Sequence, residues 1–482
     1  MKIKSFLTNK ILIYLASRYV SYGVQFFVSL IIAAKMGPYF FGIYGFITLI
    51  LNYCAVISFG IPASLNVLLV HHKTEENTCG NYIGNALLFY AIQSLLLFVL
   101  YLVLVISDFE IDNNYPIREY YLLIAIIASL NYFNSIFINV LRIKNKVNQL
   151  SVVQSLNVLL NVIVVCIVKG ENLIIALLLC NLISGIASVI VTKLCNALPP
   201  LKKKMIKITF LKEMLGKGIY LFFCNSCFAF ILISIRSLIS ANYKVEEFGA
   251  FTFSFSIANS VMLLLEALMT IIFPKLVDLL SSNDNKMVEN TLEKLRGTYI
   301  SSAHLLIYVA MLFFPILLNF MPKYSNALTS MNLIALAVLM NANSSGYSTL
   351  LISKNKERTS AALSMTALII NIILGYTLIS FFHVGFSYVI LATLFTYVYF
   401  SFMVVVKGKE CLCESNMVSS FKSFFPIRLF IPYLVALIIS CLQYENFIWL
   451  PLVLYMILNK RDIFMMFNAA KKMIINPDII NV

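Results

Sequence analysis

The sequence predicts an all-α integral membrane protein with about fourteen transmembrane helices. Hydrophobic residues make up 61% of its 482 residues and charged residues only 12%, about half the charged share that is usual in soluble proteins. Apolar runs of roughly 20 residues, the length that crosses a bilayer, recur from one end of the chain to the other. The Lys and Arg residues fall mainly in alternate loops between these runs.

The apolar runs are expected to be helices rather than strands of a barrel. Barrel strands are about 10 residues of strict alternation, whereas these runs are longer and apolar on all sides. A helix also satisfies its own backbone hydrogen bonds in lipid. The last two runs are the shortest. The predicted spans are 11–34, 41–63, 83–106, 119–141, 149–168, 172–192, 216–239, 249–273, 299–320, 328–352, 360–382, 385–406, 427–443 and 446–459.

The basic residues predict the orientation of these spans. With the N-terminus in the cytoplasm, 29 of the 36 Lys and Arg residues lie in inside segments and 5 in outside segments, and Arg18 and Arg236 lie within spans. Short cytoplasmic loops carry this excess of positive charge in membrane proteins. We therefore expect both termini in the cytoplasm. The net charge of +15 is interpreted as topology and attraction to anionic lipids, not as nucleic-acid binding.

Two sequence patterns recur at nearly one offset and predict an internal repeat. Lys144-Asn145-Lys146 recurs as Lys354-Asn355-Lys356, and Asn161 recurs as Asn371, both 210 residues later. Phe41-Gly42 recurs as Phe248-Gly249, 207 residues later. We therefore predict two six-helix bundles related by pseudo-two-fold symmetry. Their expected limits are 1–209 and 210–410, followed by helices 13–14 and a cytoplasmic tail over 411–482.

Three stretches resemble polysaccharide flippases of the multidrug/oligosaccharidyl-lipid/polysaccharide (MOP) exporter superfamily. Within that superfamily, the chain looks most like the O-antigen flippases. Many members carry an acidic residue before the basic one in the seventh helix, whereas here Ile235 precedes Arg236, so no role of that acidic residue transfers. The stretches are Gly37-Pro38-x-x-Phe41-Gly42-x-Tyr44, then Phe248-Gly249-x-Phe251 leading to Phe273-Pro274-Lys275, and Asn355-Lys356 followed by Asn371 and Val384-Gly385-Phe386.

The resemblance implies a role in lipopolysaccharide biosynthesis. Such a protein moves an undecaprenyl-diphosphate-linked O-antigen or related polysaccharide repeat unit from the inner to the outer leaflet of the bacterial cytoplasmic (inner) membrane. Alternating access between two facing bundles suits this task. The expected partners are this lipid-linked oligosaccharide and membrane lipids, with a polysaccharide polymerase and a chain-length regulator as associates by resemblance only.

Charges within spans are costly and are functional candidates by default. Arg18 in the first span and Arg236 in the seventh are candidate contacts for a diphosphate, which Arg binds with two parallel hydrogen bonds. The alternative for both is snorkelling of the side chain to the membrane surface. Asn259 is a candidate for binding sugar hydroxyls, although interhelical hydrogen bonding is the favoured explanation for each span amide taken by itself.

Two titratable residues are candidates for ion coupling. Glu266 is a carboxylate within the eighth span and would carry a proton if unpaired; the alternative is a structural ion pair. In the resembled fold the first and eighth helices face each other, so Arg18 and Glu266 are expected close together in the inner half of the cavity. His304 in the ninth span titrates near neutrality when exposed, and its alternative is a hydrogen-bonded packing residue.

The sequence contains no pattern of an ATPase, a zinc site, a nucleophile elbow or a dinucleotide fold. We therefore expect no cofactor or metal and no enzymatic activity, and the ten Cys residues indicate no disulfide framework. Two other transporters remain open, namely a multidrug/cation antiporter of the same superfamily and a peptidoglycan lipid-precursor flippase. A membrane glycan polymerase is a remote alternative, because the longest outside loop, about 107–117, is too short for a catalytic domain. The tail after Lys460 is either an interfacial amphipathic helix or a disordered basic end.

Overall fold

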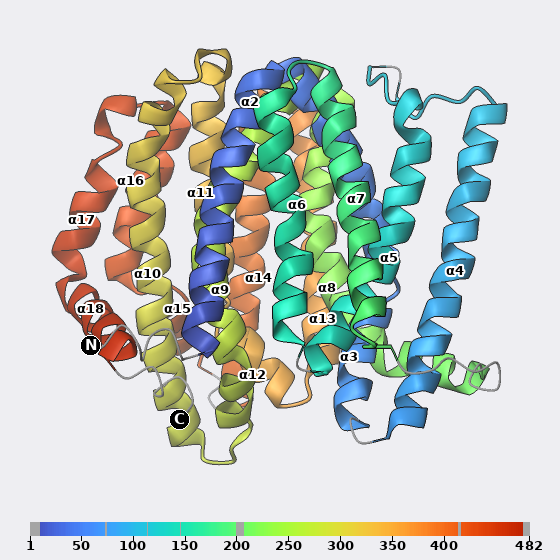
Figure 1. Cartoon of the computed structure of the whole chain (residues 1–482). Coiled ribbons are helices and arrows are strands. Elements are labelled where there is room, and N and C mark those ends of the chain that lie inside the picture. Colours follow the sequence, from blue (N-terminus) through green and yellow to red (C-terminus); the bar gives the residue numbers. More distant parts are fainter. Residues whose placement is uncertain are drawn as a thin grey trace. The chain divides into compact units, whose positions relative to one another are not determined.

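The computed structural model describes residues 10–72, 75–112, 114–144, 146–198, 207–412 and 416–475, and every regular element within them is helical (Figure 1). Short 3₁₀ turns precede several of the helices, at Arg118–Tyr120, Pro322–Ala327, Phe386–Tyr388 and Glu445–Phe447. The helices of the first half are α2 (Lys10–Val56), α3 (Ile61–His71), α4 (Glu76–Ile106), α5 (Tyr121–Ile143), α6 (Val147–Ile167), α7 (Asn172–Leu194) and α8 (Ile208–Asn242). The helices of the second half are α9 (Val245–Ser281), α10 (Asn285–Asn319), α11 (Leu328–Ala342), α12 (Tyr347–Ser353), α13 (Glu357–Ser380), α14 (Leu391–Glu410), α15 (Met417–Phe424), α16 (Ile427–Leu442), α17 (Leu450–Leu458) and α18 (Lys460–Ile475).

This architecture confirms the all-α membrane fold class. Within the described residues, ten helices are long and apolar enough to cross a bilayer, or eleven if α15 and α16, which meet at 61°, form one span. The segment Tyr19–Val56 counts once in this number although the sequence predicts two spans there. The observed helices are consistent with fourteen spans, and that number stays a prediction. The tail after Lys460 is a helix, α18, over the part that the structure describes.

The chain divides into two compact units. The first comprises Val28–Ala229 and Tyr243–Gly249, and we call it the N-terminal unit. The second comprises Met1–Phe27, Phe230–Asn242 and Ala250–Val482, and we call it the C-terminal unit. The predicted boundaries at 209 and 410 stay a prediction.

Gly37 divides α2 into two helical arms, 10–36 and 38–56. Its φ of 70° and ψ of 173° lie outside the helical range, and only glycine adopts such a conformation readily. Pro38 then begins the second arm, which is the position in a helix where a missing N–H costs least. The Gly-Pro pair therefore separates the first two predicted spans.

A close crossing of α2 and α9 lies within the N-terminal unit and involves the two glycines of the repeat. A Cβ atom on Gly249 would lie 1.9 Å from the carbonyl oxygen of Pro38, and one on Gly42 would lie 2.3 Å from the carbonyl oxygen of Val245. Both distances are far inside van der Waals contact, so neither position accepts a side chain without movement. Pro38 and Val245 are themselves 207 residues apart, as are Gly42 and Gly249. Each copy of the motif thus contacts the other in the same way.

The two Lys-Asn-Lys turns also have equivalent backbone hydrogen bonds. The amide of Lys146 donates to the carbonyl of Leu141 at 2.9 Å, and the amide of Lys356 donates to that of Leu351 at 2.8 Å. Asn355 has a φ of 55°, a left-handed conformation that Asn tolerates better than most residues. The equal hydrogen bonds at an offset of 210 residues give the sequence repeat a structural counterpart.

In the N-terminal unit, side chains complete the backbone hydrogen bonds at the break between α2 and α3. Unpaired carbonyls are costly at membrane depth, so such a break needs internal donors. Gln93 donates to the carbonyl of Ile57 at 2.7 Å, Tyr132 to that of Cys54 at 2.8 Å, and Asn139 to that of Pro62 at 2.8 Å. The second predicted span, 41–63, therefore ends earlier than the sequence suggested, and α3 begins after the left-handed Gly60.

In the C-terminal unit, α11 is the central helix, and nearly all of its side chains are buried. It packs against α10, α14 and α16, which run beside it in Figure 1. The tenth predicted span, 328–352, is broken at Gly346, whose φ is 85°, so that α12 is a separate helix. Arg296 of α10 donates to the carbonyls of Asn343 and Ser345 at 2.7 and 2.8 Å. These bonds stabilise the second helix break in the same manner as those in the N-terminal unit.

Candidate substrate-binding and ion-coupling sites

Arg236 is a buried cation in the C-terminal unit. Arg236 is 5% exposed, and its guanidinium carbon lies 5.5 Å from the centroid of the Phe255 ring on α9. This is the range in which a cation is attracted to the face of an aromatic ring. Burial to this degree does not fit the alternative of a side chain that snorkels to the membrane surface.

Asn259 lies four residues after Phe255 on α9 and is half-buried. Residues four apart share one face of a helix, so Asn259 follows Phe255 on the side of α9 that carries the contact with Arg236. The structure thus brings two of the sequence candidates, Arg236 of α8 and Asn259 of α9, to one region of the C-terminal unit.

Arg18 and Glu266 cannot be placed in the same way. Their positions fall in α2 and α9, but their side chains lie outside the part of the chain that the structure describes. Their expected proximity stays a prediction.

His304 of α10 lies in an aromatic cluster formed with rings from other helices. It is 0% exposed, and its Nδ1 is 3.0 Å from the hydroxyl of Tyr308. The rings of Phe425, Tyr433 and Tyr455 surround it, with that of Tyr455 parallel to within 4° at 6.3 Å. Its Nε2 is buried and has no hydrogen-bond partner among the described residues. This environment favours a neutral imidazole, because a charged one would need a partner for each of its two N–H groups.

Asn371, the second member of the repeated Asn pair, has a purely interhelical role. It is fully buried, donates to the carbonyl of Ile231 at 2.8 Å and to the hydroxyl of Ser234 at 3.0 Å, and accepts from Thr393 at 3.0 Å. Asn157 likewise bonds to Asn181 at 2.8 Å. Amides of this kind tie helices together within a bilayer.

The sequence from residue 7 to residue 280, more than half of the chain, matches the family model of polysaccharide biosynthesis proteins (Polysacc_synt). This chain belongs to the polysaccharide biosynthesis protein family. A comparison with curated protein sequences found no match.

Solved structures show that this family member has the fold of MOP-superfamily transporters. An inward-facing multidrug resistance MATE family transporter of the MOP superfamily aligns with a TM-score of 0.67 at 11% identity, over 84% of this chain and 98% of that one. An outward-facing structure of such a transporter aligns with a TM-score of 0.59 at 13% identity, over 84% and 95%. A MOP superfamily transporter from Pyrococcus furiosus aligns with a TM-score of 0.60 at 12% identity, over 84% and 95%. The resemblance to the MOP superfamily is thereby confirmed for the fold.

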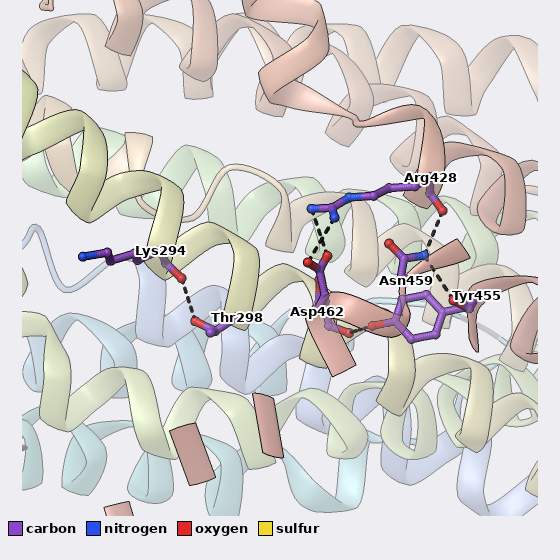
Figure 2. A network of polar contacts seen from close by, with 7 residues as sticks. Lys294, Thr298, Arg428, Tyr455, Asn459 and Asp462 are labelled. Atoms are coloured by element: carbon purple, nitrogen blue, oxygen red, sulfur yellow. Dashed lines mark hydrogen bonds and ion pairs between the residues drawn. The ribbon is translucent and has the colours of Figure 1, made fainter. Parts of the chain in front are cut away.

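The sequence reasoning missed a second polar cluster, which joins the C-terminal helices of this family member to α10. Asp462 of α18 is 0% exposed in its side chain and is paired through both oxygens with Arg428 of α16, at 3.0 and 2.9 Å (Figure 2). The hydroxyl of Ser301 on α10 donates to the same carboxylate at 3.1 Å. The hydroxyl of Tyr455 donates to the carbonyl of Ser301 at 2.8 Å, and Asn459 donates to the carbonyl of Arg428 at 2.9 Å.

Arg296 was also missed, because its charge placed it among the loop cations. The structure has it inside α10, 7% exposed, with its guanidinium carbon 4.8 Å from the ring centroid of Tyr347 and a third hydrogen bond, at 3.0 Å, to the carbonyl of Ser423. One signal for its burial is present in the sequence. Val288, Leu292 and Arg296 are spaced four residues apart, which places them on one face of a helix that continues the ninth span toward its N-terminal end.

Proposed function

We propose that this protein is a flippase for an undecaprenyl-diphosphate-linked O-antigen or related polysaccharide repeat unit. It would move this lipid from the inner to the outer leaflet of the bacterial cytoplasmic membrane, with both of its own termini in the cytoplasm. The observation that carries the proposal is the match to the polysaccharide biosynthesis protein family over residues 7–280. The transporter fold supports it, because movement of one helix bundle against another is how such transporters open a binding region to either side in turn.

The buried cation favours an anionic substrate. Arg236 lies inside the C-terminal unit at 5% exposure, and a guanidinium binds phosphate oxygens through strong, charge-assisted hydrogen bonds. In this proposal Arg236 binds a phosphate oxygen of the diphosphate, Arg18 provides a second phosphate contact nearer the inner surface, and Asn259 binds a sugar hydroxyl. Phe255 holds the guanidinium through its ring face.

The repeat supports alternating access. In the Gly42–Gly249 crossing, each copy of the motif contacts the other in the same way, which is the pattern of contacts that a two-fold axis produces. The matched hydrogen bonds of the two Lys-Asn-Lys turns agree with it. We propose that the two repeats, 1–209 and 210–410, move against each other during transport.

Glu266 and His304 are proposed to couple transport to an ion gradient. His304 is enclosed by aromatic rings and contacts the Tyr308 hydroxyl, so it would take up a proton only after the cluster around it opens. That requirement makes Glu266 the first candidate for coupling and His304 the second. A polysaccharide polymerase and a chain-length regulator are proposed as associates, on the basis of resemblance alone.

A multidrug/cation antiporter is the second candidate function, and the MATE transporters among the similar structures favour it. Those likenesses, at 11% and 13% identity, concern the fold. A buried guanidinium repels a cationic drug, so Arg236 argues against this candidate. A peptidoglycan lipid-precursor flippase fits the charge of Arg236 as well and is distinguished by its substrate. A catalytic role as a membrane glycan polymerase receives no support from a transporter fold.

Deletion of the gene and its restoration test the proposal. The strain should lose surface polysaccharide and accumulate a single lipid-linked repeat unit on the cytoplasmic side of the membrane. Wild type should restore the surface polysaccharide, whereas Arg236→Gln should lower it at least about tenfold, because one charged hydrogen bond contributes about 1.5–3 kcal/mol. Arg18→Ala should lower it as well.

Two further variants make this experiment specific. Arg236→Lys keeps the charge and should restore part of the function, and Arg118→Gln removes an exposed arginine paired with Asp108 and should restore all of it. Normal surface polysaccharide with Arg236→Gln at normal expression would remove Arg236 from the substrate path. Unchanged polysaccharide in the deletion strain, together with altered drug sensitivity, would favour the antiporter.

A further inference from the structure

A polar cavity of about 420 Å³ lies in the C-terminal unit beside the Asp462 cluster, and no step of the proposed transport uses it. Its walls come from α10, α12, α16 and α18, and from α15 with the turn that follows it. Arg296, Lys422, Arg428, Ser301, Glu293 and Asp462 provide the polar lining. A cavity with several convergent polar groups of this size is the usual form of a small-ligand site.

The charges of the lining favour an anion. Three cationic side chains face two carboxylates, and Asp462 is compensated by its paired bonds to Arg428. Those bonds use two of the five N–H donors that a guanidinium carries, so Arg428 retains donors for a second oxyanion. Glu293 is exposed, and water screens its charge.

The cations are also held in place before any ligand binds. Arg296 is fixed by three backbone carbonyls and by the ring of Tyr347, and Arg428 by the fully buried Asp462. Lys422 of α15 is exposed and provides a cation that is free to turn toward a ligand. Fixed guanidinium groups and one adjustable ammonium suit the tetrahedral oxygens of a phosphate group.

Large apolar side chains at the helices that wall the cavity are exposed. Phe421 of α15 is 52% exposed, Ile427 at the start of α16 is 72%, and Phe464 and Met465 of α18 are 68% and 39%. Met465 belongs to the cavity lining itself. A cavity lined by cations and by Met465, on helices that also carry exposed apolar side chains, matches a ligand with an anionic head and apolar chains. Interfacial helices with basic and apolar residues bind anionic bilayers in this way.

We propose that this cavity binds the phosphate head group of an anionic membrane lipid, with its acyl chains against Phe421, Ile427 and Phe464. The distribution of basic residues puts this end of α10 at the cytoplasmic surface, where anionic lipids attract Lys and Arg. The site is separate from the proposed contacts of the transported lipid at Arg236, and its test does not depend on flipping.

The test measures lipid binding to the purified full-length protein in detergent by native mass spectrometry. Phosphatidylglycerol, phosphatidylcholine and inorganic phosphate serve as probes. Wild type should retain phosphatidylglycerol in preference to phosphatidylcholine. Lys422→Gln should weaken that binding about fivefold, the effect of about 1 kcal/mol for one cation near the membrane surface. Lys294→Gln is the matched control, because Lys294 is an exposed cation of α10 that does not line the cavity, and its binding should equal that of wild type.

The outcomes separate the possible ligands. Phosphatidylglycerol binding that inorganic phosphate does not displace, and that Lys422→Gln alone weakens, supports a lipid site. Displacement by inorganic phosphate, with the same dependence on Lys422, would keep the anion site but overturn the lipid assignment. Equal retention of phosphatidylcholine, or equal losses in Lys422→Gln and Lys294→Gln, would overturn the proposal. If Lys422→Gln proves unstable, Lys422→Arg should bind as wild type does.

Discussion

Asp462 shows at the residue scale how one buried carboxylate holds three helices together. It joins α18 to Arg428 of α16 and to Ser301 of α10. Asp462→Asn removes the charge but little volume, and we expect it to lower the free energy of unfolding by about 1–3 kcal/mol. The cost is below that of a fully buried pair, because Arg428 is 42% exposed and water solvates it when its partner is lost. Thermal unfolding in detergent measures the change.

An exposed ion pair provides the control for this prediction. Lys407 and Glu410 of α14 are 2.8 Å apart with side chains 36% and 45% exposed, so Glu410→Gln should change the free energy of unfolding by less than about 0.5 kcal/mol. Equal unfolding midpoints for Asp462→Asn and wild type would show that the carboxylate does not hold α18 in place.

Charged residues within spans could be identified from the sequence as candidate functional residues, because a charge in an apolar run is costly in a bilayer. Arg236 was found in this way. Arg296 and Asp462 could not be selected in this way, because their partners are distant in the sequence. Arg296 bonds to Ser423, 127 residues later, and Asp462 pairs with Arg428, 34 residues earlier. A charge in a loop and a charge in a buried cluster look alike until their partners are known.

The crossing of α2 and α9 makes a prediction at the element scale. In Gly249→Val the Cβ would lie 1.9 Å from the carbonyl oxygen of Pro38, so the two helices must separate. We expect a loss of about 3 kcal/mol in the free energy of unfolding and a loss of transport. Surface polysaccharide and the unfolding midpoint are the two measurements.

A second glycine separates packing from helix propensity. Gly216 of α8 has nothing within 4 Å of its ideal Cβ position, so Gly216→Ala should leave stability unchanged or raise it by up to about 1 kcal/mol. If Gly249→Val proved as stable as Gly216→Ala, the close crossing would not exist in the membrane.

The two helix breaks differ in how visible they are in the sequence. The apolar pattern continues through most of 57–60, Ile-Ser-Phe-Gly, whereas 343–346 is Asn-Ser-Ser-Gly, a polar cluster typical of a turn that the predicted span 328–352 passes over. The breaks are stabilised by donors from other helices, Gln93 and Tyr132 in one case and Arg296 in the other. The break at Gly37-Pro38 could be predicted, because its cause is local.

The topology is testable at the scale of the whole molecule. The 29 to 5 distribution of basic residues predicts Lys323 outside and Lys356 in the cytoplasm, and both residues are exposed. In a variant without its native cysteines, Lys323→Cys should react with a membrane-impermeant thiol reagent in intact cells. Lys356→Cys should react only after the membrane is permeabilised, and reaction of both in intact cells would contradict the predicted orientation.

The fold of the whole chain was the most predictable feature, because span length and charge distribution are imposed by the bilayer rather than by particular contacts. The repeat was visible for a related reason, since Gly42 and Gly249 lie where a Cβ atom would clash with the backbone of the other copy, and Asn355 has a left-handed backbone that few residues tolerate. The substrate is less predictable, because it depends on side chains that line a path, and no periodic pattern marks them.

Flipping by the purified protein is the most direct test of this account. Full-length protein is reconstituted into vesicles that contain an undecaprenyl-diphosphate-linked oligosaccharide in both leaflets, and an added glycosidase then digests the oligosaccharide that is exposed outside. We predict that digestion proceeds beyond the outer-leaflet pool and approaches completion with wild type, and stops at that pool with Arg236→Gln. Digestion that stops at the outer-leaflet pool with folded wild-type protein, under every ion gradient applied, would contradict the flippase assignment.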